Sequence, residues 1–199
     1  MPRQVDHAAR RRQIAEAVFE LISEQGTEGA TLRLAAARAG VSMGAVQRCF
    51  STKAEMMTFV LEYMNQRVSE RVQNRIDASG DPDSAAIMLE QTLIGIVPVD
   101  EPSLAETRVW LAFAAQAAVD PALAAIQRRQ YADLAALINV LIRAGQGDGD
   151  LRADLDPDQE ADALITFTDG LNLQILFGRH DSRTALAALE HRLAALRAR

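Results

Sequence analysis

Residues 31–50, TLRLAAARAGVSMGAVQRCF, hold the pattern that decides the fold. Thr31 can cap a first short helix, Gly40 can adopt the left-handed conformation that ends it, and Ser42 can cap a second helix. About three residues then separate the two helices, which is the spacing of a helix-turn-helix. The stretch predicts helices over 31–39 and 42–49 with a tight turn between them.

The second of these helices has a side to bury and a side to expose. Val41, Val46 and Phe50 recur at spacings that bury them against the first helix. The side chains left facing outward are Met43, Gln47 and Arg48. A long thioether, an amide and a guanidinium suit a groove lined with thymine methyls, base edges and phosphates. The pattern indicates a DNA-reading helix, although an ordinary helical hairpin is the alternative.

A capping box follows the hairpin. In Thr52-Lys53-Ala54-Glu55, the Thr side chain can satisfy free amides of the next helix while the Glu side chain reaches back. Lys53 then lies in the first helical turn, where a cation opposes the helix dipole unless an external anion lies alongside. A DNA phosphate would be such an anion; a solvated lysine is the alternative.

These residues resemble a known signature. Gly40-Val41-Ser42, Gly44, Phe50 and Lys53 are similar to the N-terminal motif of TetR-type transcriptional regulators, over about residues 8–60. The resemblance implies that the hairpin's second helix enters the major groove and that Thr31, Ser42 and Lys53 hold phosphates. The chain departs from the family pattern in having Gln47, Arg48 and Cys49 where two tyrosines and a histidine commonly precede the Phe.

The candidate DNA-binding residues combine the outward face, the caps and nearby basic side chains. They are Arg11, Thr31, Arg33, Ser42, Met43, Gly44, Gln47, Arg48 and Lys53. We expect double-stranded DNA as the partner. Whether Gln47 takes over the contact that a tyrosine usually makes is open.

Charge is divided unevenly along the chain, whose net charge is −6. Residues 1–53 carry eight Lys or Arg against five Asp or Glu, a net charge of +3, and the remainder carries −9. DNA would repel an acidic body and attract a small basic segment. The distribution favours a DNA-facing region at the N-terminal end, where Arg10–Arg12 is the densest basic cluster.

Composition predicts an all-α fold. With 199 residues, 49% of them apolar, the chain can bury a sizeable core, and Ala and Leu dominate without alternating β-branched runs. Asp-Pro or Glu-Pro pairs at 81–82, 101–102, 120–121 and 156–157 predict helix starts. With the hairpin, the expected helices number nine and span 8–25, 31–39, 42–49, 53–79, 82–97, 102–119, 121–144, 157–179 and 182–197. We expect a three-helix DNA-binding domain over 1–52 and a six-helix ligand-binding and dimerisation domain over 53–199.

Several classes of site are not expected. Cys49 is the only cysteine, so an internal disulfide is excluded. A buried core residue is expected there, and a redox sensor is the alternative. The N-terminus has no apolar signal-peptide region, and no run reaches the ~18 apolar residues of a membrane helix, so we expect a cytoplasmic protein. GQGDGD at 145–150 lacks the residues of a phosphate or calcium loop. We expect no metal and no cofactor.

The last two helices carry apolar stripes that need a partner surface. The resemblance implies a four-helix dimer contact built from two helices of each chain, and intramolecular packing is the alternative. The residues that we assign to the dimer interface are Leu171, Ile175, Leu186, Leu189, Leu193 and Leu196.

A small-molecule effector is a further expectation. Aromatic, Met and polar side chains on several helices could surround one cavity, although each is individually more common in a core. The candidates are Phe59, Tyr63, Met88, Trp110, Phe113, Gln116, Asp169 and Asn172. A charged Asp169 could pair a cationic ligand or a neighbouring Arg. Residues 151–178 resemble, more loosely, the C-terminal domain of the subgroup that includes choline- and betaine-responsive repressors.

The sequence thus favours a ligand-responsive, homodimeric transcriptional regulator, most simply a repressor of a near-palindromic operator. The alternative is a helical small-molecule-binding protein without specific DNA binding. An enzyme is not expected, because no HExxH, GxSxG or CxxC motif occurs and the three histidines are remote from one another.

Overall fold

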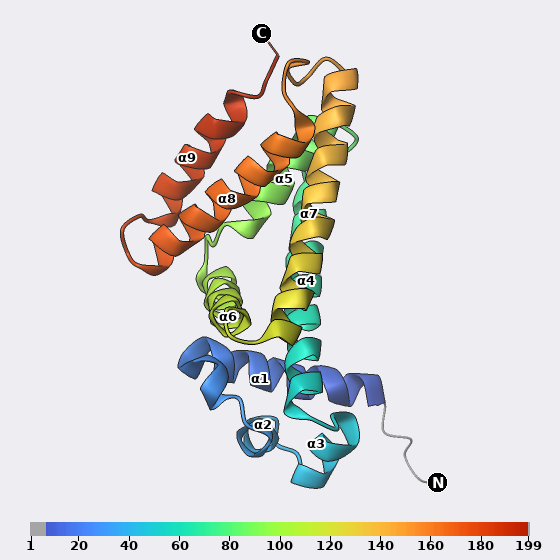
Figure 1. The fold of residues 1–199 in the computed structure, drawn as a ribbon, viewed down its shortest axis with the longest axis vertical. Coiled ribbons are helices and arrows are strands. Elements are labelled where there is room, and N and C mark those ends of the chain that lie inside the picture. Colours follow the sequence, from blue (N-terminus) through green and yellow to red (C-terminus); the bar gives the residue numbers. More distant parts are fainter. Residues whose placement is uncertain (1–6, 199) are drawn as a thin grey trace. The chain divides into compact units, whose positions relative to one another are not determined.

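The computed structural model describes residues 7–198. Arg3 and Asp6, which count toward the charge of the basic segment, lie outside the described residues. Within them the fold is all-α, as predicted, apart from one isolated antiparallel bridge between Leu151 and Arg197. The helices in this range are α1 (His7–Gly29), α2 (Leu32–Arg38), α3 (Met43–Cys49), α4 (Lys53–Asp77), α5 (Ala85–Ile96), α6 (Glu101–Ala117), α7 (Pro121–Gly147), α8 (Pro157–Leu176) and α9 (Ser182–Ala194) (Figure 1).

Three of the four predicted proline starts are confirmed. α6 begins at Glu101, one residue before Pro102, and α7 and α8 begin at Pro121 and Pro157. The start predicted at Pro82 is wrong. α5 begins at Ala85 instead, because the Ser84 hydroxyl accepts from the Ile87 amide at 3.3 Å and so caps the helix there.

The chain packs as two compact units. Of the described residues, the first unit comprises 7–67 and 105–124, and the second comprises 68–104 and 125–198. The functional division at residue 52 that the sequence suggests stays a prediction.

The first unit contains the helix-turn-helix. Its core is formed by buried apolar side chains from α1, α3, α4 and α6, which include Ile14, Phe50, Met56, Leu61 and Phe113. α1 is longer than predicted and runs to Gly29, with a kink at Gly26, whose φ of 72° lies in the left-handed region. Glycine adopts that conformation without the steric cost that a Cβ would bring.

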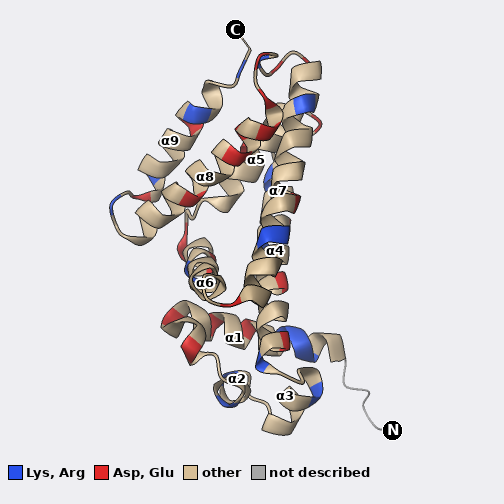
Figure 2. Ribbon diagram, in the orientation of Figure 1, with Lys and Arg blue, Asp and Glu red and all other residues tan. Residues whose placement is uncertain are grey.

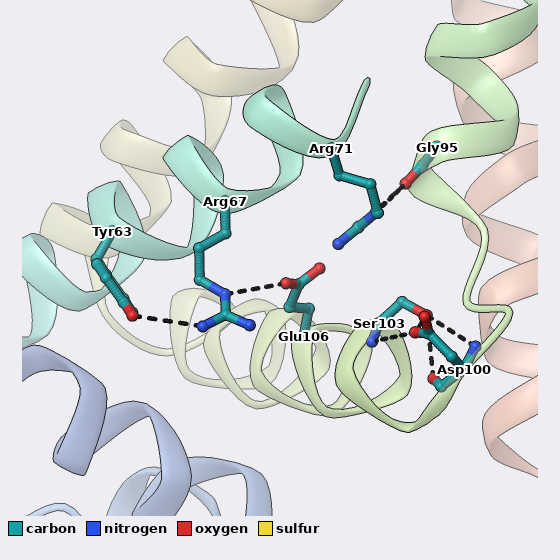
Figure 3. Close-up of polar contacts among 7 residues, drawn as sticks. All are labelled: Tyr63, Arg67, Arg71, Gly95, Asp100, Ser103 and Glu106. Carbon is teal, nitrogen blue, oxygen red and sulfur yellow. Dashed lines mark hydrogen bonds and ion pairs between the residues drawn. The ribbon is translucent and has the colours of Figure 1, made fainter. Parts of the chain in front are cut away.

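Arg67 joins α4 to α6 within this unit. Its Nε donates to Glu106 Oε1 at 3.2 Å and its guanidinium donates to the Tyr63 hydroxyl at 3.4 Å (Figure 3). The guanidinium also lies 5.4 Å from the centre of the Phe19 ring. Since Glu106 is only 4% exposed, this pairing supplies hydrogen bonds that a buried carboxylate requires.

The second unit is built around one apolar cluster. Leu89 and Leu93 of α5, Ile138 and Ile142 of α7, and Leu164 of α8 are buried there. Helix α9 lies beside α8 and α5 (Figure 1), and its Leu189 is fully buried in the same cluster. Polar contacts also join parts of the unit: Arg71 donates to the Gly95 carbonyl, and Ser103 and Asp100 cap the start of α6 (Figure 3).

None of the helices within residues 7–198 combines the length and apolarity that crossing a bilayer would require.

Candidate nucleic-acid interface

The caps that define the hairpin are present as predicted. Thr31 Oγ1 accepts from the Leu34 amide and Ser42 Oγ from the Ala45 amide, each at 3.2 Å. Gly40 has a φ of 65°, the left-handed conformation that ends α2. The Val41 amide then donates to the Ala36 carbonyl at 3.0 Å, which closes the turn.

Helix α3 presents the predicted outward face. Met43, Gln47 and Arg48 are exposed, and Met43 is 40% exposed. Val46 and Phe50 are fully buried on the opposite side, whereas Val41 is half-buried. Cys49 is buried, as predicted. The helix therefore offers a thioether, an amide and a guanidinium to a partner surface while its other side is held in the core.

Helix α1 holds the ends of both hairpin helices. Gln13 Nε2 donates to the Ala39 carbonyl at the end of α2 at 2.8 Å. Arg11 donates to the Cys49 carbonyl at the end of α3 at 2.8 Å, and His7 Nε2 lies 3.4 Å from the Arg48 carbonyl. Carbonyls in the last turn of a helix lack intrahelical partners, so these donors satisfy groups that α2 and α3 leave open. Sequence reasoning missed His7 and Gln13. His7 lies four residues before Arg11 and so on the same helix face, whereas Gln13, two residues after Arg11, lies on another face.

The Arg11 side chain forms its contacts with other residues of the first unit. Its guanidinium lies 4.5 Å from the centres of both the Phe50 and Phe59 rings and forms an ion pair with Glu55 at 3.0 Å. The two rings cover the flat faces of the Arg11 guanidinium, and the Glu55 carboxylate accepts from its N–H donors. The assignment of Arg11 to DNA binding stays a prediction. In the structure its side chain links α1 to the end of α3 and to α4.

The capping box at the start of α4 forms with a shift. Thr52 Oγ1 accepts from the Glu55 amide at 3.0 Å, as predicted. Glu55 Oε2 accepts from the Ser51 amide at 2.8 Å, one residue before the cap. That backbone hydrogen bond, followed by the one from Arg11, lowers the pKa of the Glu55 carboxyl below its ordinary value. Glu55 thus stays ionised as an acceptor for Ser51 and Arg11.

Two other predicted DNA contacts are accessible. Lys53 is exposed, and its Nζ donates to the Thr27 carbonyl at 3.1 Å. Arg33 is exposed on α2. The acidic residues of α1 lie in its middle and C-terminal part (Figure 2), where Glu20 and Glu24 pair with Arg38. The hydrogen bond from Arg38 lowers the pKa of Glu24.

The candidate effector residues are divided between the two units. Phe59, Tyr63, Trp110, Phe113 and Gln116 belong to the first unit, and Met88, Asp169 and Asn172 belong to the second. In the first unit Phe113 is fully buried, and Gln116 Oε1 accepts from Thr27 at 3.4 Å. In the second unit the Tyr131 hydroxyl donates to Asp169 at 2.8 Å, and Asn172 is buried with its Oδ1 unpartnered among the described residues.

Asp169 predicts a pH dependence of stability. Burial raises the pKa of its carboxyl above the ordinary value, and the Tyr131 hydrogen bond opposes this only in part. As the pH rises above the ordinary pKa of Asp, about 4, the unfolded chain loses this proton first and the folded state is disfavoured. We expect Asp169→Asn, which keeps an acceptor for Tyr131, to raise the melting temperature at pH 7. The gain should shrink as the pH falls toward 4; a gain that is the same at both pH values would contradict this account.

The residues assigned to a dimer interface lie mostly inside this chain. Leu171, Leu189, Leu193 and Leu196 are buried in the apolar cluster of the second unit, and Ile175 and Leu186 are half-buried against it. This is the intramolecular packing that the sequence left as the alternative. The side chains exposed on α8 and α9 are different ones, among them Ala163, Thr166, Phe177, Ala187 and Ala194.

A capped hairpin with an outward-facing second helix, anchored by a supporting helix, defines a helix-turn-helix DNA-binding protein. Comparison with known proteins agrees with this class. A model of bacterial regulatory proteins of the tetR family matches residues 14–58, and a model of the BetI-type transcriptional repressor C-terminal domain matches residues 85–198.

Relatives and solved structures extend over most of the chain. The HTH-type transcriptional regulator PksA of Bacillus subtilis is 32% identical over 176 residues, which cover 88% of this chain and 83% of that protein. The HTH-type transcriptional regulator BetI of Serratia proteamaculans is 31% identical over 140 residues, covering 68% and 70%. A transcriptional regulator from Rhodococcus sp. Rha1 superposes with a TM-score of 0.79 at 30% identity and covers 94% of this chain and 95% of its own.

The chain therefore belongs to the TetR family of bacterial transcriptional regulators, with a BetI-type C-terminal domain. A transcriptional regulator from Saccharomonospora viridis in complex with choline shares the fold, with a TM-score of 0.84 at 22% identity, covering 96% of this chain and 100% of that one.

Proposed function

We propose that this regulator acts as a homodimeric repressor, that it binds a near-palindromic operator, and that a small molecule controls the binding. The observation that carries the proposal is the exposed Met43, Gln47 and Arg48 face of a helix whose C-terminal carbonyls are held by His7 and Arg11. A recognition helix must be held rigidly, because base contacts depend on its register in the groove. Two such helices would read half-sites about 34 Å apart, or a multiple of one helical turn.

A gel-shift titration tests the DNA binding. The full-length chain is titrated onto the DNA flanking its own gene and onto a scrambled duplex of equal length. We expect selective binding that weakens as salt increases, since phosphate contacts release counterions. Equal affinity for both duplexes at physiological salt would instead support a helical small-molecule-binding protein without specific DNA binding.

Lys53 and Gln47 separate phosphate contact from base contact. We expect Lys53→Ala to weaken binding to all sequences alike and to lower the slope of log K against log salt by about one unit. Gln47→Ala should change the preference among sites, because its amide faces outward from the reading helix. Binding curves over a salt series measure both effects. An unchanged salt slope in Lys53→Ala would show that its bond to Thr27, and not a phosphate, is its role.

The effector belongs to the same proposal. Asp169 supplies a partly buried carboxyl that accepts one hydrogen bond from Tyr131, and Asn172, one turn further along α8, has a buried acceptor to spare. A cationic ligand would compensate the carboxylate, and choline, a cation, is bound by the Saccharomonospora viridis regulator. A ligand that prefers one arrangement of the protein would shift its affinity for DNA.

The homodimer would pair through the exposed faces of α8 and α9. Phe177 is 71% exposed at the end of α8, and small residues line the same stripe of that helix. Small residues allow helices to approach closely in a four-helix contact, and a large aromatic contributes much of the burial. A DNA-bound regulator of this kind would act in the cytoplasm.

A further inference from the structure

A surface pocket of about 390 Å³ lies beside the turn that joins α2 to α3, at the N-terminal end of α1. It is lined by His7, Arg10, Gly40, Val41, Ser42, Ala45, Arg48 and Cys49. The pocket therefore joins the supporting helix, the turn and one side of the reading helix. Of these residues, neither His7 nor Arg10 was among the DNA contacts that the sequence suggests.

The charge of the lining has one sign. Arg10 and Arg48 are cationic, and none of the described residues that line the pocket is acidic. Arg10 donates to the Gln13 amide oxygen at 3.2 Å, a neutral acceptor, and forms no ion pair with another residue in the described part of the chain. Within residues 7–198 Arg48 forms no ion pair, and its guanidinium extends back along α3 toward Gly44. Two guanidinium groups at one pocket, without a carboxylate from residues 7–198 beside them, attract an anion.

The position of the pocket selects the anion. It borders Ser42 and Arg48, next to the face of α3 that carries Met43 and Gln47. When a helix lies in the major groove, the phosphate backbones run along its two sides. A pocket on the side of α3 then meets a backbone phosphate and not a base edge.

We propose that this pocket seats one phosphate of the DNA backbone, held by Arg10 from α1 and Arg48 from α3. The inference rests on the proposed DNA binding and adds a contact from the supporting helix. Guanidinium groups suit this role because their planar donors match phosphate oxygens in pairs. The proposal also separates two roles within the Arg10–Arg12 cluster. Arg11 stacks on the Phe50 ring inside the domain, whereas Arg10 lines the pocket. Helix α3 contains no tyrosine that could bind a phosphate there.

The test compares Arg10→Gln with Arg12→Gln in the full-length chain. Arg12 is exposed on the same helix but does not line the pocket, so its replacement removes the same charge and leaves the pocket intact. Fluorescence anisotropy over a salt series measures binding to the duplex flanking the gene and to a scrambled duplex. We expect Arg10→Gln to weaken binding to both duplexes and to reduce the salt slope by up to about 0.9, the contribution of one phosphate. Arg12→Gln should keep the wild-type slope, and Arg10→Lys should retain most of it.

The outcomes are distinguishable. If the wild type binds no duplex, the proposed function fails and the phosphate seat with it. If the wild type binds but Arg10→Gln and Arg12→Gln have equal slopes, the seat is wrong and the function stands. If Arg10→Gln affects one sequence only, Arg10 contacts a base and the inference is overturned. If Arg10→Gln abolishes a stabilisation by inorganic phosphate without changing the DNA slope, the pocket binds a free anion and the inference is likewise overturned. Melting temperatures of all variants establish that they fold.

Discussion

Phe50→Ala is expected to destabilise the helix-turn-helix unit by about 3–5 kcal/mol, the usual cost of removing a fully buried phenyl ring from a core. Phe50 is completely buried, and its ring lies 5.5 Å from that of Phe59 and 4.5 Å from the Arg11 guanidinium. The substitution leaves a cavity and also removes one of the two rings on which Arg11 stacks. Because α3 ends at this point, we expect DNA binding to be lost together with stability. Denaturant unfolding followed by circular dichroism measures the change.

Met43→Ala is the matched control for Phe50→Ala. Met43 is an apolar residue of similar size on the same helix, but it is 40% exposed. Its truncation should change the free energy of unfolding by no more than about 0.5 kcal/mol. It should alter the preference among DNA sites instead. A Phe50→Ala protein that is as stable as Met43→Ala would show that Phe50 does not anchor α3.

Gly170→Arg is expected to yield a monomer and to lower operator affinity by about 10²–10⁴-fold, the gain that joining two binding modules provides. Gly170 is half-buried and lies on the same side of α8 as the exposed Ala163 and Thr166. A Cβ at Gly170 meets no atom within 4 Å, so a side chain there starts in open space. In a dimer paired through α8 and α9, the same side chain would hold the helices apart and add a charge to an apolar contact. Analytical ultracentrifugation gives the mass, and a gel shift gives the affinity.

Ala136→Arg on α7 is the control for the position of the dimer face. α7 also exposes apolar side chains, with Leu137 47% and Val140 61% exposed. Ala136 is exposed beside them, so an arginine there tests this second face with the same change in charge. We expect Ala136→Arg to remain a dimer with wild-type affinity. Dissociation of Ala136→Arg, with Gly170→Arg remaining dimeric, would place the interface on α7 and refute the α8–α9 pairing.

Local signals in the sequence were sufficient for most of the fold. The caps at Thr31 and Ser42 and the turn at Gly40 depend on atoms within three or four residues of each other, so they could be read directly. The outward face of α3 follows from helical periodicity in the same way. The helix start predicted at Pro82 was wrong because Ser84, two residues later, caps the helix instead. Spacing alone does not show which of two neighbouring start signals a helix uses.

Contacts between distant segments were not predictable. Arg11 carries a side chain that is typical of DNA contacts, yet it stacks on two aromatic rings that lie 39 and 48 positions further along the chain. The leucines of α9 look like an interface stripe, but packing buries them against α5 and α8 of the same chain. An amphipathic stripe shows that a helix needs a partner surface and not whether that surface belongs to the same molecule.

By itself, the sequence determined the class of this protein: its helices, the capped hairpin and the side of α3 that faces outward, all of which follow from spacings of three and four residues. Only the tertiary structure decided which arginine of the Arg10–Arg12 cluster faces the pocket, which leucines are core, and which face of α8 remains for a partner. The physical reason is that helical period assigns a side chain to a face, whereas burial and pairing depend on what the folded chain brings against that face.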